Sequence, residues 1–173
     1  MASLADAPPG KMLRSPPAWD RRDRTGLTLS ILIPLVAVVA GNGLLVLTKG
    51  LQSADYAAVS WSPPGWVIGA IWCVVYPLWG AARWKVATSD EIRASRSMWV
   101  AALIVWGLCY PVVVSFTGTA GSVVANVFSL VLALIATIRV WPVSRAAVML
   151  LAPSIVWLCI ANALGFAALE GAG

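Results

Sequence analysis

The residues best suited to chemistry are three aromatic side chains that recur at helical spacing: Trp72, Tyr76 and Trp79. On a helix that turns about 100° per residue, the three lie within about 60° of one another and form one stripe. Such a stripe can stack against a planar apolar ligand, and each ring adds an N–H or O–H group. Tryptophans are also enriched at membrane interfaces, which is the alternative explanation for Trp61 and Trp84 near the ends of the same stretch.

Asn126 is a polar side chain within an apolar run. Polar groups at membrane depth usually face the interior of a helical bundle. Asn126 could there form a hydrogen bond to another helix, or it could contact a ligand. Arg83 is expected to extend toward lipid headgroups, with contact to a ligand carboxylate as the alternative. Gly65, Gly69 and Gly80 have the spacing of a close helix–helix contact.

The chain lacks the groups that most catalysis requires. It has no histidine, and the interiors of its apolar runs contain no aspartate, glutamate or lysine. A proton relay, a metal cage or a nucleophile activated by a neighbouring base is therefore excluded from these runs. We expect no catalytic residues, no metal and no required cofactor, so any chemistry would come from the bound ligand.

The composition assigns the chain to the membrane. Of its 173 residues, 60% are hydrophobic and 11% are charged, against about 25% charged in soluble domains. The net charge of +5 is distributed between apolar runs rather than in one patch, which argues against nucleic-acid binding. Cys73, Cys109 and Cys159 are isolated in apolar runs and are expected to be small buried hydrophobes without a disulfide or metal.

The apolar runs predict an all-α integral membrane protein with five transmembrane helices. Residues 1–25 are expected to be a polar, disordered cytoplasmic tail, and 26–170 a five-helix domain. The predicted spans are approximately 27–47, 61–85, 98–116, 120–140 and 146–169. Pro63 and Pro64 are placed in the first turn of the second span. We expect a short exposed connection at 86–97 and a tight turn at 117–119.

The positive charges predict the orientation. With five spans, eleven of the twelve lysines and arginines fall on one side of the membrane, and Lys49 alone falls on the other. By the positive-inside rule, the N-terminus is cytoplasmic and the C-terminus external.

Two motifs resemble the translocator protein family, also called the tryptophan-rich sensory protein (TspO/MBR) or peripheral benzodiazepine receptor family. The first, similar to the family's W-x-P-P signature, is Ser60-Trp61-Ser62-Pro63-Pro64-Gly65-Trp66. The second, similar to its final-helix P-Y-x-x-W…A pattern, is Ala152-Pro153-Ser154-Ile155-Val156-Trp157, followed by Ala161 and Leu164. The sequence departs from the family where Ser154 replaces a tyrosine and where the third helix lacks asparagines.

The resemblance implies a ligand pocket inside a five-helix bundle. In the family, the tryptophans that match Trp72 and Trp157 line this pocket and are implicated in porphyrin chemistry. Ala161 lies on the same helix face as Trp157, where a small residue suits either a cleft for a flat ligand or close helix packing. The candidate ligand-binding residues are Trp72, Tyr76, Trp157, Ala161, Asn126 and Trp61.

The resemblance also implies a porphyrin or another tetrapyrrole as ligand, or a sterol or other lipid. The role would be tetrapyrrole handling, stress signalling, reception or transport, in a bacterial cell membrane, with membrane lipid and a second copy of the chain as partners. Two alternatives stay open. One is a structural or interaction subunit without a small ligand, and the other is an enzyme that degrades porphyrin in the light.

Overall fold

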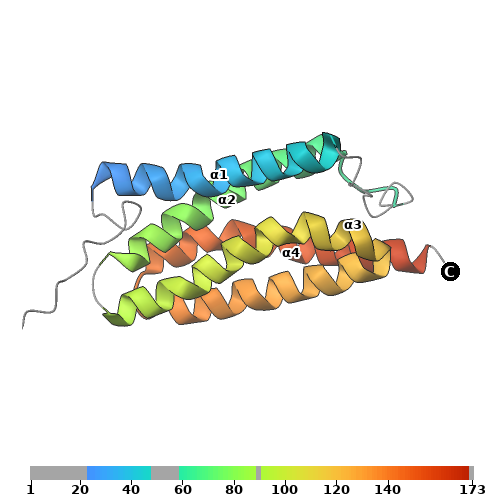
Figure 1. Ribbon diagram of the computed structural model, residues 1–173. Coiled ribbons are helices and arrows are strands. Elements are labelled where there is room, and N and C mark those ends of the chain that lie inside the picture. Colours follow the sequence, from blue (N-terminus) through green and yellow to red (C-terminus); the bar gives the residue numbers. More distant parts are fainter. Residues whose placement is uncertain (1–22, 48–58, 89–90, 172–173) are drawn as a thin grey trace, which may run out of the picture.

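The protein is a bundle of long helices in the part that the computed structural model describes, residues 23–47, 59–88 and 91–171 (Figure 1). The helices are α1 (Arg24–Leu47), α2 (Gly65–Ala87), α3 (Glu91–Val140) and α4 (Arg145–Glu170). All four are long and apolar enough to cross a membrane, which confirms a membrane-type, all-helical protein. The predicted count of five separate helices is not confirmed, and most of the predicted tail lies outside the described residues.

The difference in count comes from α3, which has 50 residues and is interrupted at Gly118 (φ 63°, ψ −163°). A straight helix of this length would extend about 75 Å, more than twice the thickness of a bilayer core. Instead, 91–117 and 119–140 run back alongside each other (Figure 1). Three nested hydrogen bonds join these two halves: Arg96 Nη1 to the Arg139 carbonyl oxygen (3.2 Å), Trp106 Nε1 to Ser129 Oγ (2.7 Å), and the Tyr110 hydroxyl to Asn126 Oδ1 (2.7 Å).

Two predicted helix boundaries are wrong. Helix α2 begins at Gly65 rather than Trp61, because Val59 to Ser62 form a turn closed by the Ser62 N–H and the Val59 carbonyl oxygen (2.9 Å). Pro63 and Pro64 therefore precede the helix. The predicted connection at 86–97 is mostly helical, since α2 continues to Ala87 and α3 begins at Glu91. Charged side chains beyond the apolar run do not end a helix when they can point into the aqueous layer.

The core lies where α2, α3 and α4 meet. Helix α1 packs chiefly against α2, and α4 packs against α3 and α2. The largest cluster of buried apolar side chains comes mostly from α2, α3 and α4, and α1 adds only Val38. The outer surface is also apolar, as expected where lipid is the solvent. The expected burial of the cysteines is wrong: Cys73, Cys109 and Cys159 are all exposed on this outer surface, as free thiols.

Of the three glycines expected at a helix contact, only Gly80 makes one. A Cβ at Gly80 would overlap the Ser30 carbonyl oxygen of α1, whereas nothing lies within 4 Å of a Cβ at Gly65 or Gly69. The bare backbone at Gly80 therefore permits the close approach of α1 to α2.

We expect Gly80→Ala to lower the free energy of unfolding by about 1–3 kcal/mol, because the added methyl group must displace backbone atoms of α1. Gly69→Ala is the matched control on the same helix, where the methyl group meets open space. Thermal unfolding in detergent measures both variants. Equal midpoints for the two would contradict the close approach at Gly80.

Gly118→Ala tests the reversal of α3. The Gly118 backbone lies in a region that essentially only glycine adopts, so we expect a loss of about 1–3 kcal/mol from strain alone. No neighbouring atom would contact the new Cβ, so steric overlap does not contribute. Denaturant unfolding in mixed micelles measures the loss. A variant as stable as the unmodified protein would show that Gly118 adopts another conformation.

Candidate functional site

The predicted aromatic stripe forms a contiguous group of rings on α2. Ring centroids lie 5.8 Å apart for Trp72 and Tyr76, 6.0 Å for Trp72 and Trp79, and 5.2 Å for Tyr76 and Trp79. The planes are tilted or edge-on, which aromatic quadrupoles favour. Tyr76 and Trp79 are 2% and 1% exposed, whereas Trp72 is half-buried. Trp72 is thus the member of the stripe with ring surface left to offer.

Helix α3 completes this group through Gly107 and Tyr110. A Cβ at Gly107 would lie 2.7 Å from the Tyr76 hydroxyl oxygen and 2.9 Å from a ring carbon of Trp79, so only a glycine lets the α3 backbone lie against these rings. One turn later, the Tyr110 ring lies 6.4 Å from that of Trp72. We call Trp72, Tyr76, Trp79 and Tyr110 the aromatic cluster.

A chain of hydrogen bonds connects the aromatic cluster to α4. The Tyr110 hydroxyl donates to Asn126 Oδ1 (2.7 Å), and Asn126 Nδ2 donates to the carbonyl oxygen of Ala161 (3.4 Å). Because Asn126 is only 2% exposed, its amide needs hydrogen-bond partners inside the bundle, and these two bonds provide them. Helices α3 and α4 also pack closely beside these hydrogen bonds, because a Cβ at Gly165 of α4 would lie 2.7 Å from the Val123 side chain of α3. Of the two roles considered for Asn126, the structure shows the interhelical hydrogen bond.

The six candidate residues fall into two groups. Trp72 and Tyr76 belong to the aromatic cluster, and Asn126 and Ala161 join it through Tyr110. Trp157 is buried on α4, one turn before Ala161, but makes no ring contact with the cluster within the described chain. Trp61 lies in the turn before α2 and is 53% exposed, so the structure does not bring it to the cluster.

Three buried polar atoms have no hydrogen-bond partner among the described residues: Trp79 Nε1, Trp157 Nε1 and Asn162 Oδ1. In Asn162, the amide nitrogen Nδ2 donates a hydrogen bond to the Leu158 carbonyl oxygen (2.7 Å), while the amide oxygen Oδ1 has no donor. Buried N–H and C=O groups are nearly always paired, and an unpaired one in an apolar medium costs free energy. Two indole donors and one amide acceptor are therefore both buried and unpaired within the described bundle.

The chemistry available at the aromatic cluster is stacking and neutral hydrogen bonding. Its members carry no charge, and the described residues contain no group of three histidine, cysteine, aspartate or glutamate side chains that could hold a metal ion. Such surroundings suit a flat, largely apolar molecule with a few polar edges, because stacking needs area and the indole N–H groups need acceptors.

A comparison with models of protein families matches residues 30–169 to the TspO/MBR family. The chain belongs to the TspO/MBR family. The matched region runs from α1 to α4 and contains both motifs on which the resemblance was based, so that prediction is confirmed. No curated protein matched the chain. Family membership and the four apolar helices together identify an integral membrane protein.

The departure from the TspO/MBR pattern at Ser154 has a local explanation in the packing. Ser154 is 1% exposed and donates to the Leu151 carbonyl oxygen (2.7 Å), so its hydroxyl is satisfied within α4. This position therefore holds a small residue on the buried face of α4.

Sequence reasoning missed two residues of this site, Tyr110 and Gly107. A signal for Tyr110 is present: Tyr110 and Asn126 are equally far from Gly118 on either side. If 117–119 is a reversal, an antiparallel pair of helices places these two polar side chains opposite each other. Gly107 has no such signal, because its role depends on how closely α3 approaches α2.

A double-mutant cycle of Tyr110→Phe and Asn126→Leu measures the hydrogen bond that joins the halves of α3. We expect a coupling free energy of about 0.6–1.7 kcal/mol, the range found for interhelical hydrogen bonds in membranes. The control cycle pairs Tyr110→Phe with Ser129→Ala, whose hydroxyl contacts Trp106 instead. Reversible unfolding in mixed micelles gives the free energies. Coupling no larger than in the control would contradict the assignment.

Proposed function

We propose that this TspO/MBR protein crosses the membrane five times, with α1, α2, the two halves of α3 and α4 as the crossings. The reversal at Gly118 supports this topology, because each half of α3 is long enough for about 30 Å of hydrocarbon. The basic side chains of the described residues then gather at one end of the bundle, which by the positive-inside rule is cytoplasmic. They are Arg24, Arg83, Lys85, Arg96, Arg139 and Arg145.

We propose that the protein binds a flat apolar molecule, a porphyrin or related tetrapyrrole, against the aromatic cluster and the Trp157 indole. The observation that carries this proposal is the half-buried ring of Trp72, which keeps accessible surface beside the closely packed rings of Tyr76 and Trp79. A tetrapyrrole offers a large flat face to such a ring. The family resemblance supplies the ligand class.

The biological role that follows is tetrapyrrole handling, stress signalling or transport in a bacterial cell membrane. The neutral site favours ligand recognition over catalysis. A second copy of the chain as partner also rests on the resemblance.

A second candidate function is a structural or interaction subunit without a small ligand. The observation in its favour is that Asn126 uses both polar atoms of its amide within the bundle, while Tyr76 and Trp79 are almost completely buried. On this alternative, the rings are packing elements. It does not account for the two unpaired indole N–H groups.

Titration with protoporphyrin tests the ligand proposal. We expect saturable quenching of tryptophan fluorescence and a shift in porphyrin absorbance. The double variant Trp72→Phe with Trp157→Phe should raise the dissociation constant at least about tenfold, because it removes two indole N–H groups and part of the stacking area. The absorbance readout matters because the variant has fewer tryptophans.

Trp141→Phe is the matched control, since Trp141 is exposed in the turn between α3 and α4. Unchanged porphyrin affinity in the double variant would contradict the site assignment. Absence of any saturable change in the unmodified protein would favour the structural subunit. Loss of porphyrin absorbance only under illumination with oxygen, abolished in the double variant, would favour the light-dependent enzyme.

A further inference from the structure

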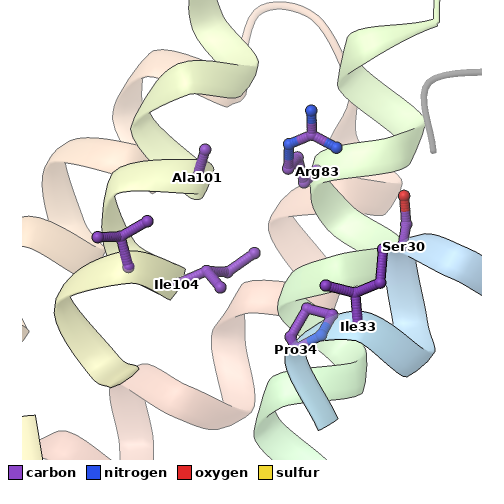
Figure 2. A pocket seen from close by; sticks show the side chains of 7 residues that line it. Ser30, Ile33, Pro34, Arg83, Ala101 and Ile104 are labelled. Atoms are coloured by element: carbon purple, nitrogen blue, oxygen red, sulfur yellow. The ribbon is translucent and has the colours of Figure 1, made fainter. Parts of the chain in front are cut away.

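A cavity lies between α1, α2 and α3, outside the aromatic cluster, and has a volume of about 270 Å³. Figure 2 shows its lining: Ser30, Ile33 and Pro34 from α1, Arg83 from α2, and Ala101 and Ile104 from α3, with Val105 as the remaining member. None of the six candidate ligand residues contributes to it. Its occupant therefore has to be deduced from its own chemistry.

The lining has one charge. Arg83 is half-buried, and its guanidinium group lies at one end of the cavity, while Ile104, Ile33 and Pro34 lie toward the other (Figure 2). Arg83 makes another interaction in the structure. A guanidinium carries five N–H donors and can therefore hold more than one partner at a time. The cavity is thus amphipathic, with a cationic end and an apolar end.

The cavity opens toward the surroundings of the bundle. Ile33 is 49% exposed and Val105 is 61% exposed, although Ser30 and Ile104 beside them are buried. In a membrane-spanning bundle these exposed apolar side chains contact the bilayer. A molecule that fills the cavity can therefore enter sideways from the lipid.

The dimensions favour a slender occupant. Pockets that enclose drug-sized ligands have volumes of about 300–1,000 Å³, so a cavity of about 270 Å³ holds one hydrocarbon chain more readily than a macrocycle. Arg83 lies one turn before the end of α2 at Ala87, about 6 Å along the axis. Its guanidinium thus reaches the depth of lipid headgroups, and the apolar end of the cavity lies deeper in the hydrocarbon.

We propose that this cavity binds an anionic phospholipid of the leaflet at the basic end, with one acyl chain between α1 and α3 and the phosphate paired with Arg83. Charge complementarity favours an anionic lipid over a zwitterionic one. Lys85 and Arg96 lie at the same end of the bundle, and such cations attract anionic lipids to the surface. Arg83 differs from them because it lines the apolar cavity and can bind the phosphate in a fixed geometry.

The test uses full-length protein reconstituted in vesicles of phosphatidylglycerol and phosphatidylcholine, then released into detergent. Native mass spectrometry counts the phospholipids that stay bound. We expect the unmodified protein to retain phosphatidylglycerol in preference to phosphatidylcholine. Arg83→Gln should lower the retained phosphatidylglycerol about tenfold, because it removes a charge-assisted hydrogen-bond pair.

Lys85→Gln is the matched control, since it removes the same charge from the same end of α2 at an exposed position outside the cavity. It should change the retention less than twofold. A second variant, Ala101→Phe, adds a bulky ring to the α3 wall of the cavity across from Arg83, and it should also release phosphatidylglycerol although the guanidinium is retained. Its fold is checked by circular dichroism and by thermal unfolding in detergent, both of which should match the unmodified protein.

Equal losses for Arg83→Gln and Lys85→Gln would overturn the proposal, because they would indicate diffuse attraction to a basic surface. Equal retention of the two lipids by the unmodified protein would overturn it as well. The Trp72→Phe and Trp157→Phe double variant should keep its phosphatidylglycerol. That result separates this cavity from the aromatic cluster, whatever the outcome of the porphyrin titration.

Discussion

The reversal of α3 at Gly118 is the constraint on which the rest of the bundle depends. It places residues 91–117 beside 119–140, and the three hydrogen bonds described between the two halves follow from that register. Shifting the reversal by one residue would rotate one half by about 100° and move Asn126 away from Tyr110. Because Asn126 also donates to α4 through the Ala161 carbonyl oxygen, the same shift would leave a buried amide without partners.

The sequence is informative about this fold because lipid and water demand such different side chains. The long apolar runs mark the helices, and Gly118 between two threonines marks the reversal. The boundaries are less predictable, since hydrophobicity reports where the membrane ends rather than where a helix ends. Helix α3 extends to Glu91 through charged residues, and α2 begins only at Gly65 because the Val59–Ser62 turn and two prolines precede it.

The contacts of the candidate site also differ in how well the sequence predicts them, depending on whether they lie within one helix or between helices. The stripe of Trp72, Tyr76 and Trp79 lies on one helix, so helical periodicity alone brings the rings together, as the structure confirms. Contacts between helices depend on rotation and depth, which a periodicity does not contain. For this reason Tyr110 and the close approach at Gly107 were missed, and the exposed cysteines were expected to be buried.

One face of α2 carries both the aromatic rings and the cationic end of the cavity between α1, α2 and α3. Arg83 follows Trp79 at the spacing of one helical turn, so the face changes from neutral rings to a guanidinium over about 16 Å from Trp72. A charge is costly near the bilayer centre and cheap near the headgroups, so this order matches the dielectric gradient across one leaflet. The same gradient suits the flat apolar face of the proposed tetrapyrrole at the aromatic cluster and an anionic headgroup at Arg83, so the two proposed ligands do not compete for the same part of α2.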